Sequence, residues 1–266
     1  MDVSIILPLF NPDKEILTLI ERRIKEQDFK GKIEVIKVEM GMGLAASMNY
    51  GIKKAKYGIV ITLHQDSIPV DDKWLKDLTA PFQDDSVVAS VSKVCFPDEL
   101  YERLDIFTKS MMLKEKGTIT PLLDEKGCAY RKEVIMGLGL FNDRDFKTSG
   151  EDFDMYIRIK DKGKIAYPST AIIHHHPTSF LRRLKKIYQN SNGFGANVRI
   201  HRTNMPRWFL GFFRAIPIIG IIPLLLTFPF GLGGFLYFPF MAISPLINII
   251  YTIGFWKGFL MKKQSI

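Results

Sequence analysis

Short apolar runs alternate with amphipathic stretches over the first hundred residues. Runs rich in β-branched residues predict strands at Val3–Phe10, Ile33–Val38, Gly58–Leu63 and Val87–Val94. Apolar residues at helical spacing predict helices between these runs, at Asp13–Gln27, Leu44–Lys56 and Asp72–Phe82. Because this alternation is typical of βαβ units, the pattern predicts an α/β domain with a mostly parallel sheet.

The C-terminal pattern is different, since the 42 residues from Ala215 to Trp256 carry no charged side chain. This is about twice the ~20 residues that cross a bilayer as one helix. We therefore predict a transmembrane hairpin with spans at Trp208–Phe230 and Phe235–Phe255, joined by a glycine-rich turn. Five prolines, at positions 217, 223, 229, 239 and 245, imply kinked helices or helices partly in the interface. A hairpin buried in a soluble core is the alternative, but a domain of this size could not cover it.

Charge is divided as sharply as hydropathy. All 28 acidic residues precede Phe180, whereas 11 of the 37 basic residues follow it, so the net charge of +9 belongs to the C-terminal part. A basic stretch beside an apolar one favours a membrane partner over nucleic acid. Arginines and lysines flank the predicted hairpin and its turn has none, which predicts a multi-pass cell-membrane protein with the N-terminal domain and both termini in the cytoplasm.

These patterns together predict three parts of the chain. Residues 1–179 form the α/β domain, residues 180–207 form a basic amphipathic segment at the interface, and residues 208–266 form the hairpin with a short basic tail. A solvated charge run is the alternative for the middle part. Cys95 and Cys128 are too few for a disulfide framework and have no spaced companions for a zinc site.

Polar residues follow the first three predicted strands, namely Asn11, Glu39 and the run His64 to Ser67. In open α/β sheets, ligands bind beyond the carboxyl ends of the strands. Loops are polar in any case, so position alone gives this site only modest support.

Three stretches of sequence resemble the family-2 glycosyltransferases with a GT-A fold, over about Val3 to Gly195. They are VSIILPLFNP, then KIEVIKVEMGMGLAASMNYGIKKAKYGIVITLHQDS, then SGEDFDMYIRIKDKG, in the family's order and spacing. The resemblance implies a nucleotide-diphospho-sugar donor. The donor-binding residues that it implies in the first two stretches are Pro8, Phe10, Asn11, Glu39, Asn49, His64, Gln65 and Asp66.

The third stretch resembles the family's ED motif, which implies that Asp152 is the base that deprotonates the acceptor, with Glu151 beside it in the sugar cleft. Acids at the start of a helix are also favoured by the helix dipole, so a purely structural role is the alternative. The run KGCAYRKEVIMGLGLFND resembles the stretch that precedes this motif, where Gly127 and Cys128 would contact the sugar.

A divalent cation, Mn²⁺ or Mg²⁺, is implied by the match of Asp66 to the last acid of the family's DxD motif. His64 stands where most relatives have the first acid, either as a ligand or as an inert loop histidine. In AIIHHHPTS, the resemblance implies His176 or His174 as a further ligand, and these two side chains face opposite to His175 on an extended strand. Arg183 and Lys186 lie where related membrane enzymes close a loop over the diphosphate.

The resemblance implies an inverting, metal-dependent hexosyltransferase, and GDP-mannose is the donor we favour. The hairpin favours a polyisoprenol-linked phosphate or oligosaccharide as acceptor, as in polyisoprenyl-linked mannosyltransferases and rhamnosyltransferases or a minimal cellulose-synthase-like enzyme. The alternatives are a rhamnosyltransferase or glucosyltransferase of the same type, or a non-catalytic membrane scaffold that binds glycans. The expected partners are the lipid bilayer and no nucleic acid, and a homo-oligomer is left open.

Overall fold

The computed structural model describes residues 1–39, 41, 43–113, 122–146, 149–175, 179–205 and 209–261. The chain forms two compact units. The first unit comprises Met1–Cys95, Thr118–Asp143 and Glu151–His176, and the second comprises Phe96–Gly117, Arg144–Gly150 and Pro177–Ile266. The second unit therefore includes two segments that precede the basic stretch in sequence. The three-part division drawn from the sequence stays a prediction.

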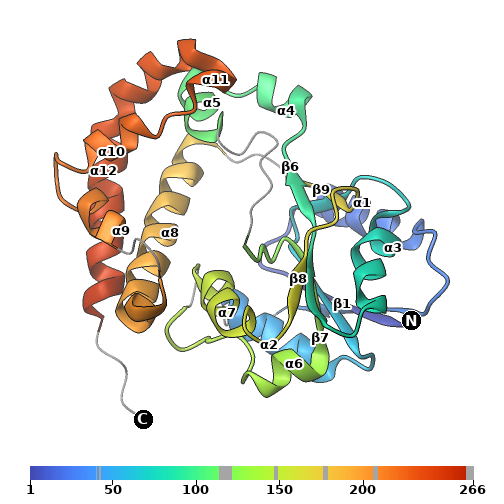
Figure 1. Ribbon diagram of the computed structural model, residues 1–266. Helices are drawn as coiled ribbons and strands as arrows, with labels where there is room; N and C mark the ends of the chain where they lie inside the picture. The colour runs from blue at the N-terminus through green and yellow to red at the C-terminus, as the bar shows by residue number, and fades with distance from the viewer. Residues whose placement is uncertain are drawn as a thin grey trace. The chain divides into compact units, whose positions relative to one another are not determined.

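The strands of the first unit form two sheets, whose arrangement can be followed in Figure 1. Among the described residues, the larger sheet has six strands in the order β2-β1-β3-β7-β5-β8. These strands are β1 Val3–Pro8, β2 Ile33–Val38, β3 Ile59–Leu63, β5 Val87–Val91, β7 Gly127–Arg131 and β8 Lys164–Ala166. The smaller sheet has the order β4-β9-β6, with β4 Ser67–Pro69, β6 Lys93–Cys95 and β9 Ile172–His175.

Most neighbouring strands of the larger sheet are parallel. Strand β1 pairs in parallel with β2 and β3, and β5 pairs in parallel with β8. Strand β7 is antiparallel to both of its neighbours, β3 and β5. The prediction of an α/β domain with a mostly parallel sheet is therefore confirmed, and the carboxyl ends of β1, β2 and β3 lie at one edge.

Helices cover both faces of the larger sheet. The helices of the first unit are α1 Lys14–Lys25, α2 Leu44–Lys54, α3 Trp74–Thr79, the 3₁₀ helix η1 Ala80–Gln83, α6 Lys132–Gly137 and α7 Glu151–Ile159. Alternate residues of β1 face opposite layers, so Ile5 packs in one core with Ile20 of α1 and Trp74 of α3. Ile6 packs in the other core with Met48 of α2.

Element boundaries follow local signals that the sequence contains. Helix α1 begins after Asp13, whose side-chain oxygen accepts hydrogen bonds from the backbone N–H groups of Glu15 and Ile16 at 2.9 and 3.2 Å. The predicted strand Val87–Val94 is two strands in different sheets. The predicted helix Asp72–Phe82 becomes a short α-helix and a 3₁₀ turn, because Pro81 cannot continue the α-helical hydrogen bonding.

In the described part of the second unit, all regular elements are helices. They are α4 Asp98–Glu102, α5 Ile106–Met112, α8 Phe180–His201, η3 Arg202–Asn204, α9 Phe209–Arg214, α10 Ile221–Leu226, α11 Phe230–Gly233, η4 Gly234–Leu236 and α12 Tyr237–Leu260. Helices α8 and α12 lie side by side in Figure 1. A Cβ at Gly195 would meet the carbonyl oxygen of Phe255, and one at Gly258 would meet that of Asn192. Residues 180–201 of the predicted basic segment thus form a helix with one face packed closely on α12.

The predicted hairpin of two continuous spans is corrected in part. In the described part of the second unit, one helical stretch, Phe230–Leu260, is long and apolar enough to cross a membrane, with 28% of its most apolar window buried. The predicted first span is instead divided into the six-residue helices α9 and α10. Between them Ile218 adopts a left-handed backbone conformation, with φ of 68°, directly after Pro217.

Candidate active site

Loops from three adjacent parallel strands meet at the carboxyl edge of the larger sheet. The Gln65 side chain, after β3, accepts a hydrogen bond from the backbone N–H of Phe10 at 2.7 Å and donates one to its carbonyl at 2.9 Å. This pair of bonds fixes the loop after β1 to the loop after β3. Pro8 ends β1 and is buried, whereas Asn11 follows with φ of 45° and Glu39 is exposed after β2. The structure therefore brings these predicted donor-binding residues to one edge.

Asp66 pairs with a histidine at this edge. Its Oδ2 lies 3.3 Å from Nε2 of His175. Burial raises the pKa of the Asp66 carboxyl. The hydrogen bond and charge of His175, together with His64 and Lys126, lower that pKa by a larger amount and hold it well below its usual range. Asp66 is thus ionised at neutral pH and is able to accept a hydrogen bond or to bind a cation.

The strand register explains which histidine reaches Asp66. Strands β4 and β9 are antiparallel, with Ser67 opposite His175 and Ile68 opposite His174. Because neighbours on a strand face opposite sides, His174 points away from Asp66. Burial, and then the charge of Arg23, lower the pKa of His174. The geometry favours His175 over His174 as the partner of Asp66, and the other candidate, His176, lies outside the described residues.

A lysine lies close to the two acids that the sequence singled out. Lys126 precedes β7, and its Nζ lies 3.0 and 3.1 Å from the two carboxylate oxygens of Asp124. Burial lowers the pKa of Lys126, but Asp124, then Asp152 and Asp66, raise it by a larger amount. Lys126 therefore stays charged and shares its surroundings with both Asp66 and Asp152.

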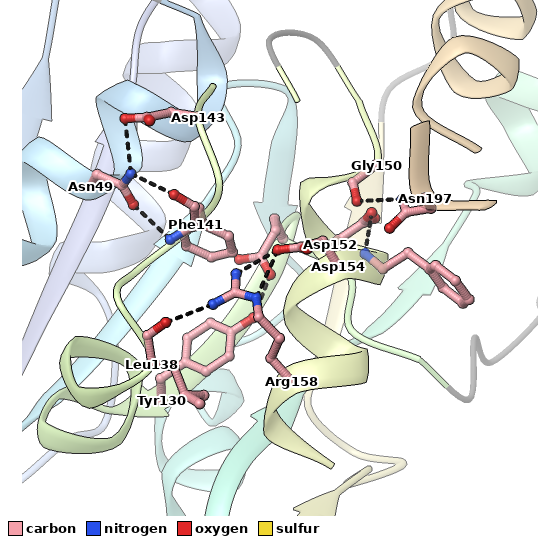
Figure 2. Close-up of polar contacts among 12 residues, drawn as sticks. Asn49, Tyr130, Leu138, Phe141, Asp143, Gly150, Asp152, Asp154, Arg158 and Asn197 are labelled. Carbon is pink, nitrogen blue, oxygen red and sulfur yellow. Dashed lines mark hydrogen bonds and ion pairs between the residues drawn. The ribbon is translucent and has the colours of Figure 1, made fainter. Parts of the chain in front are cut away.

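Helix α7 carries two aspartates with different environments (Figure 2). The carboxylate of Asp154 is buried and accepts hydrogen bonds from Nε and Nη2 of Arg158 at 2.8 and 2.5 Å, while Nη1 of Arg158 donates to the Leu138 carbonyl at 2.9 Å. Asp152 instead accepts a hydrogen bond from the N–H of Phe153 at 2.7 Å, in the first turn of the helix. Asp154 therefore has a structural role, and Asp152 is the better catalytic candidate of the two. Glu151, just before it, is buried.

Glu125 lies behind this cluster, buried at 2% exposure. Thr62 Oγ1 donates a hydrogen bond to its Oε2 at 2.6 Å, and the Tyr130 hydroxyl bonds to its Oε1. Burial is the main cause that raises the pKa of Glu125, to about 8, and the charges of Asp152 and Glu151 add to it. The hydrogen bonds from Thr62 and Tyr130 lower the pKa, but by less. At neutral pH its carboxyl is mostly protonated and adds no charge to the cleft.

Several other predicted site residues have contacts of a structural kind. Asn49 donates from Nδ2 to the Phe141 carbonyl at 2.9 Å and accepts from the Phe141 N–H at 2.9 Å, so it holds a loop (Figure 2). Cys128 is fully buried in the core, and a Cβ at Gly127 would lie 2.8 Å from Ser92 Oγ. Arg183 and Lys186 lie on α8 in the second unit. Their roles in donor binding stay predictions.

A divalent cation fits this edge only if the donor brings part of its coordination shell. Among the described residues no group of three or more His, Cys, Asp or Glu is arranged to hold a metal. Asp66 and His175 supply one carboxylate and one imidazole at ion-pair distance. Mg²⁺ and similar ions are commonly held by one or two protein groups plus substrate phosphates, and an imidazole suits Mn²⁺. This pair therefore fits a cation that arrives bound to a diphosphate.

The pattern of one known family covers most of the first unit. The sequence profile of glycosyl transferase family 2 matches residues 12–139, which include the edge loops, Asp66 and Lys126. Residues 12–139 are a family 2 glycosyltransferase domain. The chain has the GT-A fold, as its mixed α/β sheet and its structural neighbours agree. No curated protein sequence matches the chain.

Two solved structures illustrate the fold. The mannosyltransferase PcManGT from Pyrobaculum calidifontis, in complex with GDP-Man and Mn²⁺, aligns with a TM-score of 0.60 and 15% identity over 94% of this chain and 86% of its own. GalNAc-T7 with UDP, GalNAc and Mn²⁺ aligns with a TM-score of 0.57 and 15% identity over 80% of this chain and 50% of its own. Both alignments support the glycosyltransferase fold of the chain.

Sequence reasoning missed several charged residues of this site. Asp124, Glu125 and Lys126 follow one another just before the small residues of β7, and the run of three charges against a buried strand was the available signal. His175 was missed because the family pattern favours the histidines one position either way. Its selection depends on how β9 pairs with β4, which a single sequence does not specify.

Proposed function

We propose that this chain is an inverting hexosyltransferase in which Asp152 is the general base. The observation that carries the proposal is that Lys126, ion-paired with Asp124 beside the loop that carries Asp66, has its charge stabilised by both Asp66 and Asp152. One carboxylate would lie on the side of the leaving diphosphate and the other would serve the acceptor. The ion pair of Asp154 with Arg158 supports Asp152, rather than Asp154, as the base.

The reaction needs one proton acceptor and one site for a leaving anion. Asp152 would take the proton of the acceptor hydroxyl, whose oxygen forms a bond to the anomeric carbon while the bond from that carbon to the diphosphate breaks. The electron pair leaves with the nucleoside diphosphate, and the configuration of the sugar is inverted. For a phosphate acceptor, which is already ionised, the attacking oxygen needs no base, and it forms the bond to the anomeric carbon as the diphosphate leaves.

The cation stays part of the proposal. Asp66 and His175 would hold Mn²⁺ or Mg²⁺ together with the donor, and the ion would supply charge neutralisation of the leaving diphosphate. His64, next to the pair, would hydrogen-bond the donor. The tight fixing of Phe10 by Gln65 supports a preformed nucleotide edge, with Asn11 and Glu39 beside it.

The donor is proposed from a structural neighbour, and the acceptor is proposed from the surface of the second unit. GDP-mannose is the first donor to test, since it is bound to the Pyrobaculum structure that shares this fold. Polyisoprenol-linked phosphate or oligosaccharide is the proposed acceptor because the second unit exposes apolar side chains suited to a bilayer. Rhamnose and glucose donors are the alternatives within the same class.

Membrane attachment is proposed through the apolar surface of the second unit. One helical stretch, Phe230–Leu260, is suited to a membrane by length and composition, and the interrupted segment before it has the form of an interfacial insertion. Two full crossings, a cytoplasmic catalytic domain and cytoplasmic termini stay predictions from the flanking charges. Protease protection of tagged termini in sealed vesicles would test that orientation.

The decisive experiment incubates the full chain in lipid nanodiscs with radiolabelled GDP-, UDP- and dTDP-sugars, Mn²⁺ and polyprenyl phosphate. We expect transfer of label to lipid and, when a polyprenyl-linked saccharide is supplied as a second acceptor, at least ~100-fold slower transfer to it in Asp152→Asn, because one positioned base contributes about 10²–10⁴-fold. For a phosphate acceptor the loss should be smaller than for a saccharide acceptor, since no proton is removed.

Asp161→Asn is the matched control, because Asp161 is an exposed carboxyl just beyond the end of the same helix. It should leave transfer unchanged. The enzyme proposal is wrong if no donor is consumed by the wild type and the two variants behave alike. That result would favour the glycan-binding scaffold.

A further inference from the structure

We propose that Lys126 is a donor-binding residue that contacts the diphosphate directly and supplies positive charge to it independently of any metal ion. This inference rests on the proposed function and names a binding residue of the same site. It concerns the binding of the nucleoside diphosphate, which can be measured whether or not transfer occurs.

The backbone holds Lys126 at the carboxyl edge of the sheet. It lies in a turn in which the Gly127 N–H donates to the Asp124 carbonyl at 3.2 Å, and its own N–H donates to Asp124 Oδ1 at 3.2 Å. Strand β7, which begins at Gly127, pairs with β3 on one side and β5 on the other. The residue before it is therefore fixed beside the loop that carries Asp66.

The Lys126 ammonium is held by Asp124, and its side chain is not fully enclosed. Asp124 binds it through both oxygens, at 3.0 and 3.1 Å, while a quarter of the Lys126 side chain, 25%, remains exposed. A lysine ammonium has three N–H donors. Two bonds to Asp124 leave donor capacity for a ligand on the exposed side.

Lys126 can attract an anionic ligand, and the acidic residues around it can take over its charge again when the ligand leaves. Asp66 and Asp152 both contribute to its electrostatic environment, and Asp124 bonds to it directly. A diphosphate that replaces water here would meet one ammonium together with the Asp66 and His175 pair. Lysine is a common point-charge binder of phosphate.

Because His64 replaces the first acid of the DxD motif, a lysine that neutralises the diphosphate would be useful at this site. His64 stands where a second carboxylate would be, so the protein holds fewer acidic ligands for a cation near Asp66. A fixed ammonium compensates part of the diphosphate charge without coordination. When the bond from the anomeric carbon to the diphosphate breaks, the added negative charge on the leaving oxygen falls within reach of this cation.

A purely structural ion pair between Lys126 and Asp124 is the competing explanation. Such a pair would stabilise the turn and contribute nothing to ligands. The two explanations differ in one measurable respect: a structural lysine affects the binding of GDP and GMP alike, whereas a diphosphate contact affects GDP alone.

The test measures GDP and GMP binding to the full chain in nanodiscs by calorimetry in EDTA, with UDP and UMP as a second pair. We expect the wild type to bind the nucleoside diphosphate without metal. Lys126→Met should weaken that binding at least ~10-fold, in line with a hydrogen bond to a charged group, while changing monophosphate binding less than ~2-fold. Lys126→Arg, which keeps the charge, should retain most of the affinity.

Lys162→Met is the control, since Lys162 is exposed beyond α7 and should change neither affinity. Equal losses for the diphosphate and the monophosphate in Lys126→Met would overturn the proposal, as would wild-type affinity in that variant. So would a wild type that binds neither diphosphate in EDTA. If Lys126→Met does not fold, loss of metal-free diphosphate binding in a folded Lys126→Arg variant would also overturn the proposal. Failure of transfer with intact selective binding would contradict the enzyme proposal alone.

Discussion

Glu125 takes no part in the proposed proton transfer, but its raised pKa makes the stability of the fold depend on pH. Its pKa is raised from 4.5 to about 8, so it holds a proton in the folded chain that the unfolded chain releases. Because the folded state binds more protons between these values, the free energy of unfolding falls as pH rises from about 4.5 to about 8.

Replacing Glu125 by Gln should remove this pH dependence. The amide keeps an acceptor for Thr62 and cannot ionise, so we expect Glu125→Gln to gain stability over the wild type as pH rises from 5 to 8, on the order of a few kcal/mol. Denaturant unfolding followed by tryptophan fluorescence at several pH values measures it. Exposed Glu133→Gln is the control. Parallel wild-type and Glu125→Gln curves would contradict the raised pKa.

Individual residues of the site were predictable where they follow a strand and not where tertiary pairing selects them. Asp66 follows β3, so its place at the carboxyl edge of the sheet was predictable, while the roles of Asp66 and Asp152 in the reaction stay predictions. Asn49 matched the same pattern but makes its hydrogen bonds with Phe141. Sequence spacing does not tell a ligand contact from a loop contact, since both require a polar side chain.

At the scale of elements, Asn248 of α12 is the side chain that stabilises the break between α9 and α10. Its Oδ1 accepts a hydrogen bond from the Ile218 N–H at 3.1 Å, and its Nδ2 donates to the Arg214 carbonyl at 2.9 Å. Asn248 is 1% exposed, so both bonds are shielded from water. The backbone groups left by the broken helix are thus satisfied from a neighbouring helix.

We therefore expect Asn248→Leu to destabilise the second unit by about 1–3 kcal/mol, because two backbone groups lose their partner in an apolar setting. Thermal unfolding in detergent, followed by circular dichroism, measures the change. Ser244→Ala is the matched control: Ser244 is equally buried one turn earlier, and its Oγ bonds to the Met241 carbonyl of its own helix. An equal loss in both variants would mean that Asn248 does not support the break.

Strands and helices with a clear period were predictable, and the interrupted C-terminal segment was predictable only in part. The pattern predicted β1, β2 and β3 to within two residues, because β1 and β3 are buried along their whole length and are nearly all apolar, and the edge strand β2 is rich in β-branched residues. The apolar length before residue 230 also predicted a span, but apolar length does not specify helix continuity. The prolines at 217, 223 and 229 and the bonds from Asn248 decide it, and the latter come from a distant element.

At the scale of the whole molecule, the exposed apolar side chains belong largely to the second unit. Those most exposed there include Leu181 at 75%, Ile218 at 78%, Leu226 at 78%, Phe235 at 72% and Phe238 at 69%. Exposure of so many large apolar side chains on one unit is typical of an interaction surface, and the basic residues of α8 favour anionic lipid. This unit would concentrate the first unit near a lipid-linked acceptor.

Ile218 allows membrane contact to be separated from folding. It is exposed and adopts a positive φ of 68°, a conformation that β-branched residues disfavour and asparagine tolerates. We expect Ile218→Asn with Leu226→Asn to weaken partition into anionic vesicles by about tenfold or more, from lost apolar burial, without lowering the unfolding temperature. Vesicle flotation at several lipid concentrations measures the partition.

Met136→Asn is the control, since Met136 is an exposed apolar side chain on α6 of the first unit. It should leave partition unchanged. If the double variant floats as the wild type does, the segment from α9 to α10 does not lie in lipid, and Phe230–Leu260 alone would have to carry the attachment. If partition persists but becomes sensitive to salt, the basic face of α8 is the remaining contact, because screening weakens charge attraction and leaves apolar insertion intact.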